Sequence, residues 1–117
     1  MSKHHQINYV EIPARDLSVT KNFFTRVFDW QFTDYGPEYC SIENASLDGG
    51  FYLSEKVATT ERGSVLVVLY SDDLEQTMAE IVAHDGLISR AIFSFPGGSR
   101  FHFNDPSGNE FAVWKKD

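Results

Sequence analysis

The segment YVEIPARDL at residues 9–17 and the segment LVVLYSDDL at residues 66–74 share one pattern. Each begins with an extended, largely apolar run, ends in Asp-Leu and leads into apolar residues at helical spacing. The offset from residue 9 to residue 66 is 57 positions, close to half of the 117-residue chain. Such self-similarity indicates a duplicated strand-helix unit. We expect the two copies to face one another and to enclose a cleft.

The residues after each copy predict the same order of elements, namely strand, helix, strand, strand, strand. In the first half these elements are expected at residues 7–13, 17–29, 30–35, 39–43 and 51–54, with a turn at 44–50. In the second half they are expected at 64–71, from Asp72 or Asp73 to Asp85, within 87–95, at 100–104 and at 110–115. The apolar run at 64–71 predicts a strand buried on both faces.

Residues 55–63 are polar and suit a connector between the two halves. The predicted fold class is therefore α+β, with two βαβββ modules at about residues 6–55 and 64–116. We expect both modules to form one domain that spans residues 1–117, because a chain of this length supports a single core.

Composition and charge exclude several classes of protein. The net charge of −7, without a basic stripe, argues against nucleic acid as a partner. The longest apolar run, at residues 65–70, is far below the roughly 20 residues that span a bilayer, so no membrane partner is expected. Cys40 is the only cysteine, which rules out an internal disulfide and favours the cytoplasm. Its place in an apolar strand predicts a buried structural side chain rather than a nucleophile.

Alternation along the strands separates apolar faces from mixed ones. In the strand at 100–104, Phe101 and Phe103 should pack under a helix, which leaves Arg100, His102 and Asn104 on the opposite face. The same reasoning turns eight side chains toward the cleft: Tyr9, Glu11, Tyr39, Glu43, Tyr70, His102, Glu110 and Trp114. An aromatic cleft with a few polar groups is typical of a small-molecule site, and it is equally typical of a dimer interface.

Four segments resemble the vicinal-oxygen-chelate superfamily: EIPARDL at 11–17, NFF at 22–24, VFDW at 27–30 and DPSGN at 105–109. This superfamily includes glyoxalases, extradiol dioxygenases, epimerases, and fosfomycin and bleomycin resistance proteins. The resemblance extends from Ile7 to Trp114 and implies paired βαβββ modules whose sheets curve around a cleft, usually within a homodimer.

Catalytic members of that superfamily commonly hold a divalent metal through His or Gln and Glu side chains. By the resemblance, three of the ligand positions fall on Tyr9, Leu66 and Ala112, and the fourth falls near Ser54 or Glu55. Leu and Ala have no donor atom, and neutral Tyr is a poor ligand for such metals. We therefore expect no metal at the usual site and no other cofactor. The alternative is a divalent metal relocated to His102, Glu11 and Glu110.

Two hypotheses about function follow. The first is a cytoplasmic, homodimeric protein that binds a small apolar or aromatic molecule without a metal, through Tyr9, Tyr39, Tyr70, His102, Glu110 and Trp114. The second is a lyase or isomerase in which Glu11 is the catalytic proton-transfer group, with or without a relocated metal. A third possibility is a drug-sequestering resistance protein.

Overall fold

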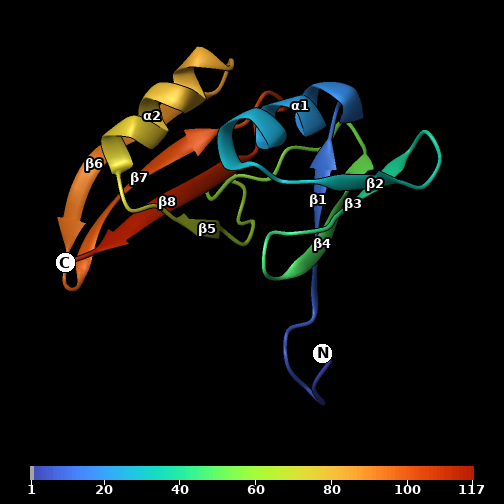
Figure 1. The fold of residues 1–117 in the computed structure, drawn as a ribbon, viewed down its shortest axis with the longest axis horizontal. Helices are drawn as coiled ribbons and strands as arrows, with labels where there is room; N and C mark the ends of the chain where they lie inside the picture. The colour runs from blue at the N-terminus through green and yellow to red at the C-terminus, as the bar shows by residue number, and fades with distance from the viewer. Residues whose placement is uncertain (1) are drawn as a thin grey trace. The chain divides into compact units, whose positions relative to one another are not determined.

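The computed structural model describes residues 2–117 and divides into two compact units, one ending at Lys56 and the other beginning at Val57 (Figure 1). Each unit contains one four-stranded sheet and one helix, in the order strand, helix, strand, strand, strand. The predicted α+β fold of two βαβββ modules is confirmed. Residues 57–63, which the sequence assigns to a connector, belong to the second unit.

The first unit consists of β1 (Tyr9–Ala14), α1 (Leu17–Phe28), β2 (Phe32–Asp34), β3 (Tyr39–Ile42) and β4 (Asp48–Leu53). Its sheet has the order β1-β4-β3-β2, with β1 parallel to β4 and the other pairs antiparallel. As predicted, Asp16 caps α1, and its side chain accepts a hydrogen bond from the Val19 backbone N–H at 3.1 Å. The helix ends at Asp29, whose φ of 59° is left-handed.

Aromatic side chains form the core of the first unit. Phe24 is fully buried, and its ring centroid lies 5.3 Å from that of Phe51 and 4.7 Å from that of Trp30. Cys40 is also fully buried, and burial raises the pKa of its thiol, as expected for a structural cysteine. Complete burial of one phenylalanine side chain, such as that of Phe24, stabilises the fold by about 1.5–3 kcal/mol.

Strand β4 begins at Asp48, so the prediction of a turn through residue 50 is wrong. The strand positions 49 and 50 are glycines because their neighbours approach too closely for a side chain. A Cβ atom on Gly49 would lie 2.7 Å from the Val10 carbonyl oxygen. A Cβ atom on Gly50 would lie 2.8 Å from the Cys40 carbonyl oxygen and closer still to the Tyr39 hydroxyl oxygen.

The second unit consists of β5 (Val67–Tyr70), α2 (Leu74–Ala83), β6 (Leu87–Phe95), β7 (Gly98–Asn104) and β8 (Glu110–Lys116). Its strand order, β5-β8-β7-β6, repeats that of the first unit, with β5 parallel to β8. Asp73 caps α2 and accepts a hydrogen bond from the Gln76 backbone N–H. None of the helices in residues 2–117 is long and apolar enough to cross a membrane.

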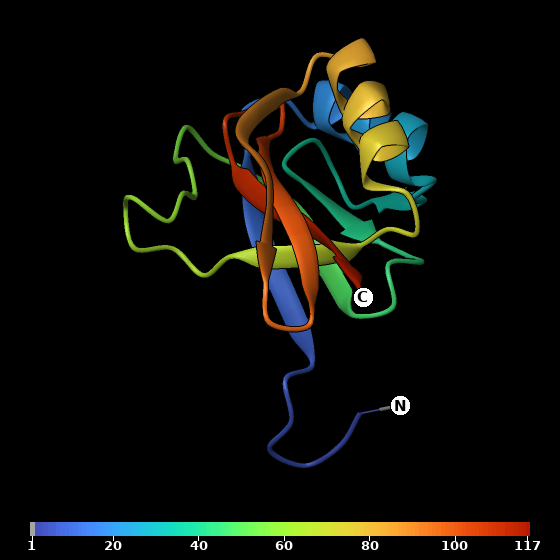
Figure 2. The ribbon, with the colours of Figure 1, turned by 90° about the vertical axis from the view of Figure 1, so that its left-hand side faces the viewer.

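Two predictions for the second unit need correction. Strand β5 is not buried on both faces: Val68 and Tyr70 are 43% and 44% exposed, because β5 is an edge strand with one mixed face. Strand β6 is nine residues long instead of short, and it forms an extended hairpin with β7 (Figure 2). The β6–β7 register shifts on both sides of Arg90, which marks bulges in this edge strand.

Candidate functional site

One face of the second sheet carries most of the polar and aromatic side chains that the sequence proposes for a site. Across β7 and β8, Asn104 pairs with Glu110 and Arg100 pairs with Trp114, while Tyr70 of β5 also pairs with Trp114. Paired residues in a sheet project to the same side. The opposite side holds the buried Phe101, Phe103, Phe111 and Val113. The predicted separation into an apolar and a mixed face is therefore confirmed for this sheet.

The turn between β7 and β8, residues 105–109, is organised by the buried Asp105 carboxyl group. Its Oδ1 accepts hydrogen bonds from the backbone N–H groups of Ser107 at 3.0 Å and Asn109 at 2.9 Å. The Asn109 side-chain amide also donates to Oδ2 at 3.2 Å. Burial raises the pKa of Asp105 from 3.8 to about 6, although these hydrogen bonds act in the opposite direction.

The same turn holds the segment that precedes β5. The Ala58 N–H donates to Asn109 Oδ1 at 2.9 Å, and the Glu110 N–H donates to the Ala58 carbonyl oxygen at 2.8 Å. These bonds place Thr59 and Thr60 beside the start of β8. Residues 57–63 therefore contribute directly to the candidate site. The sequence did not predict this, because the segment is polar and has no periodic pattern.

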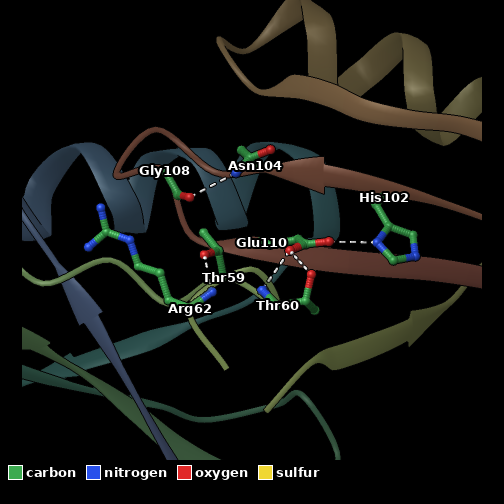
Figure 3. Close-up of polar contacts among 7 residues, drawn as sticks. All are labelled: Thr59, Thr60, Arg62, His102, Asn104, Gly108 and Glu110. Carbon is green, nitrogen blue, oxygen red and sulfur yellow. Dashed lines mark hydrogen bonds and ion pairs between the residues drawn. The ribbon is translucent and has the colours of Figure 1, made fainter. Parts of the chain in front are cut away.

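Glu110 is the centre of a hydrogen-bond network (Figure 3). Its Oε1 accepts from the Thr60 N–H at 2.8 Å and from the Thr60 hydroxyl at 2.7 Å, and its Oε2 lies 2.7 Å from His102 Nδ1. Burial alone would raise the pKa of Glu110, but the bonds from His102 and Thr60 outweigh it and lower the pKa. Since an ionised carboxylate only accepts hydrogen bonds, His102 Nδ1 carries a proton and donates a hydrogen bond to Glu110.

In the neutral imidazole, this arrangement leaves the other ring nitrogen of His102, Nε2, with an open lone pair. The residue is only 5% exposed, and its Nε2 is buried without a hydrogen-bond partner among residues 2–117. A buried polar atom without a partner costs about 1–3 kcal/mol, so such an atom marks a place where a water molecule or a ligand is expected. We name His102, Glu110 and Thr60 the imidazole–carboxylate cluster.

A cavity of about 500 Å³ adjoins this cluster. The residues that line it are Thr59, Thr60, Glu61, Ser89, Arg90, His102, Asn104 and Glu110. Its walls therefore combine hydroxyl and amide groups with two carboxylates, one guanidinium and one imidazole. The volume lies in the range of small-molecule sites, while the lining residues are all polar.

Guanidinium groups and aromatic rings alternate along the same face. The Arg90 guanidinium carbon lies 3.7 Å from the Phe93 ring centroid, and that of Arg100 lies 5.3 Å from Phe93 and 5.8 Å from Phe95. The Trp114 ring follows, with its centroid 6.2 Å from that of Phe95 and 5.2 Å from that of Tyr70. We call these six residues the aromatic–arginine row. Tyr70 and Trp114 were predicted as site residues, and alternation placed Arg100 on the mixed face without assigning it to the site. Arg90, Phe93 and Phe95 were missed because they lie in β6, where bulges break the alternation.

The first unit holds a second, smaller cluster formed by Tyr9, Glu11 and Tyr39. The Tyr39 hydroxyl donates to Glu11 Oε2 at 3.0 Å and lies 2.6 Å from the Tyr9 hydroxyl. Burial, followed by these two hydrogen bonds, raises the pKa of Tyr39, so its phenol stays neutral. Because the single O–H group of Tyr39 donates its hydrogen bond to Glu11, the Tyr9 hydroxyl must donate to Tyr39. The Tyr9 oxygen is then left as an acceptor.

The structure locates the fourth of the metal-ligand positions that the resemblance implies. Ser54 and Glu55 follow the end of β4, whereas the resemblance puts the fourth ligand on that strand. In the second unit, Ala112 pairs with Val68, which lies two residues after Leu66. In the first unit, the residue two positions after Tyr9 is Glu11, and it pairs with Gly50. Gly50 is therefore the equivalent of Ala112. The fourth position therefore falls on Gly50, which has no side-chain donor.

These residues do not fit a divalent metal at the usual site. Gly50, Leu66 and Ala112 offer no donor atom, and the Tyr9 hydroxyl is already bonded to Tyr39. No three His, Cys, Asp or Glu side chains among residues 2–117 are placed to hold a metal ion. The absence of any cofactor stays a prediction.

The raised pKa of Asp105 predicts a pH dependence of stability. Its folded-state value of about 6 lies above the ordinary 3.8, so its contribution to the free energy of unfolding is full below pH 3.8 and is lost as the pH rises through 6. The upper limit of this change is about 3 kcal/mol. Urea unfolding at several pH values should show that the stability difference between wild type and Asp105→Asn shrinks by up to that amount on going from acidic to neutral pH. A difference that is constant with pH would show that Asp105 titrates normally.

Comparison with solved structures shows what the fold is similar to. A glyoxalase-related enzyme from Fulvimarina pelagi aligns with a TM-score of 0.78 and 22% identity, covering 96% of this chain and 88% of that one. A glyoxalase/bleomycin resistance protein/dioxygenase family enzyme from Burkholderia phytofirmans PsJN aligns with a TM-score of 0.80 and 17% identity, covering 96% and 99%. Lactoylglutathione lyase from Agrobacterium tumefaciens aligns with a TM-score of 0.70 and 14% identity, covering 97% and 95%. These identities show a shared fold and no more.

Comparison with curated proteins gives no significant match. The sequence profile of the Glyoxalase/Bleomycin resistance protein/Dioxygenase superfamily, however, matches residues 6–113, which include both modules. The chain therefore belongs to the glyoxalase/bleomycin resistance protein/dioxygenase superfamily.

Proposed function

We propose that this protein binds a small planar aromatic molecule on the mixed face of its second sheet, without the usual metal. The observation that carries the proposal is the aromatic–arginine row beside a cavity of about 500 Å³. Aromatic faces attract a flat ring through dispersion and offset stacking. Guanidinium groups favour a ligand that also carries a carboxylate or another acceptor group.

Exposure of the row supports this use. Tyr70 is 44% exposed and Val68 beside it is 43% exposed, while Phe101, Phe103, Phe111 and Val113 on the opposite face are buried. The Arg100 Nε atom is buried without a hydrogen-bond partner among residues 2–117. An arginine held on aromatic rings with an unsatisfied donor is prepared for an acceptor group of a ligand.

Benzoate is the simplest probe of this binding. We expect benzoate to raise the melting temperature of the protein by mass action, and to do so more than cyclohexanecarboxylate, which has the charge without the ring, or benzyl alcohol, which has the ring without the charge. Arg100→Gln and Trp114→Leu should each weaken benzoate binding about tenfold, since each removes roughly 1.4 kcal/mol of interaction.

The matched control is Arg26→Gln, which removes an arginine from the last turn of α1 in the first unit. It should leave benzoate binding unchanged, and so should a chelator. Equal effects of Arg26→Gln and Arg100→Gln, or no preference for benzoate over cyclohexanecarboxylate, would contradict the proposal.

A second function is supported by the chain of hydrogen bonds in the first unit. We propose as the alternative a lyase or isomerase in which a proton leaves the substrate through Tyr9 and Tyr39 to Glu11. The direction of the chain supports it, because every hydroxyl donates toward the Glu11 carboxylate and the Tyr9 oxygen is left to accept. Tyr9 is 43% exposed and can therefore be reached.

Glu11→Gln tests this chain before any substrate is known. Removing the carboxylate should move the raised pKa of Tyr39 back toward its ordinary value, which an ultraviolet titration of tyrosinate measures. Any lyase or isomerase turnover should fall at least about 100-fold. Glu43→Gln is the matched control, since Glu43 bonds to Ser41 and not to either tyrosine. An unchanged Tyr39 titration in Glu11→Gln would remove the proposed role.

We further propose that the protein is a cytoplasmic homodimer. Superfamily membership and the single buried cysteine support this. Light scattering on the purified protein should give twice the mass of one chain, 13.3 kDa. A mass of one chain at micromolar concentration would refute the dimer.

A further inference from the structure

We propose that His102 Nε2 is the contact of this site for a weakly acidic hydroxyl group, such as that of a phenol, and that it takes the proton of that hydroxyl on binding. The inference rests on the proposed function, because the phenol ring would lie along the aromatic–arginine row. It adds the chemical class of the ligand and a change in the ligand's protonation state.

Hydrogen bonding at Nδ1 makes Nε2 an acceptor when the His102 ring is neutral. Glu110 is held by two bonds from Thr60, and its remaining oxygen lies 2.7 Å from His102 Nδ1. Nδ1 therefore donates, and in the neutral ring Nε2 is an acceptor. Since Nε2 has no partner within residues 2–117 and the ring is 5% exposed, a ligand hydroxyl would satisfy it.

Charge around the cavity favours a ligand that arrives neutral. Glu61 and Glu110 both line it and disfavour an anionic group next to His102, whereas the carboxylate of a ligand such as benzoate is favoured at Arg100, which does not line this cavity. Arg90 also lines it and lies on Phe93, whose ring centroid is 5.9 Å from that of His102. A phenol can therefore place its ring near Phe93, its hydroxyl at Nε2 and an acceptor substituent near Arg90.

Access to Nε2 lies with strand β6. Arg90 is the residue of β6 that pairs with His102, and the register shifts on both sides of it. Arg90 is exposed and Phe93 is only half-buried, so their side chains can move without unpacking the core. We infer that these two side chains cover Nε2 until a ligand displaces them.

The proton transfer balances within the pair. The phenol O–H bond breaks, its proton forms an N–H bond at Nε2, and the electron pair stays on the phenolate oxygen. The products are a phenolate and an imidazolium that donates from both nitrogens, one to the phenolate and one to Glu110. The carboxylate stabilises the new positive charge, as in other carboxylate–histidine pairs. No oxidant, reductant or metal takes part.

The probe is 4-nitrophenol, whose neutral and ionised forms absorb at different wavelengths. At a pH below its solution pKa, where most of the free dye is neutral, adding wild-type protein should raise the phenolate absorbance in proportion to the dye bound. Quenching of tryptophan fluorescence measures the bound fraction independently. His102→Gln should bind dye without the phenolate band.

Glu110→Gln is the sharper variant. A glutamine that keeps its carbonyl oxygen toward Thr60 turns its NH₂ group toward His102. Nδ1 must then accept, so the tautomer changes and Nε2 carries the proton. This variant should lose the phenolate band while its cavity keeps nearly the same shape. His84→Gln, at the end of α2, is the matched control and should behave as wild type.

The outcomes separate this inference from the proposed function. If benzoate binds in an Arg100-dependent way and 4-nitrophenol binds without a phenolate band, the face binds aromatics and the role of His102 is refuted, with a water molecule as the partner of Nε2. If benzoate shows no such binding, the proposed function fails, whatever the dye does. A phenolate band that survives in both His102→Gln and Glu110→Gln would also overturn the inference.

Discussion

The buried Asp105 carboxyl group is the constraint on which the second unit depends. Its hydrogen bonds to the backbone of Ser107 and Asn109 close the turn between β7 and β8. That turn sets the register in which Asn104 pairs with Glu110, and it leaves the Asn109 amide oxygen to hold Ala58. The segment before β5 is thereby brought to Glu110. The buried Asp105 carboxylate thus accepts the hydrogen bonds that close the turn, and its raised pKa means that ionisation near neutral pH lowers the stability of the fold.

The two modules repeat one backbone with different chemistry on equivalent positions. Gly50 in the first sheet corresponds to Ala112 in the second, and neither can bind a metal. In the first unit the space over Gly50 is taken by Tyr39, which a Cβ atom at Gly50 would displace. In the second unit the ionisable side chains near Ala112 are His102, which pairs with Ala112 across the sheet, and Glu110, two residues before it. A shared superfamily fold therefore does not by itself bring the superfamily's usual ligand pattern with it.

Much of the fold could be predicted from the sequence because its determinants are local. Asp16 and Asp73 are both helix caps, and alternation placed His102 and Glu110 on the face opposite Phe101 and Phe111. The failures have physical causes that lie outside a local pattern. Gly49 and Gly50 occupy strand positions at which the approach of Val10 and Tyr39 excludes a side chain. Thr60 joins the candidate site through a hydrogen bond to Glu110, 50 positions away in the sequence. Phe93 and Phe95 were missed because bulges in β6 interrupt the period of two.

The account of the site rests on the tautomer of His102, which proton-detected nitrogen NMR of the side chain measures directly. Glu110 is held as an acceptor by Thr60, so the neutral ring of the free protein should carry its proton on Nδ1 and leave Nε2 unprotonated. Binding of an acidic phenol should then protonate Nε2 as well. A proton found on Nε2 alone in the free protein would contradict the account, because His102 could then no longer accept from a ligand.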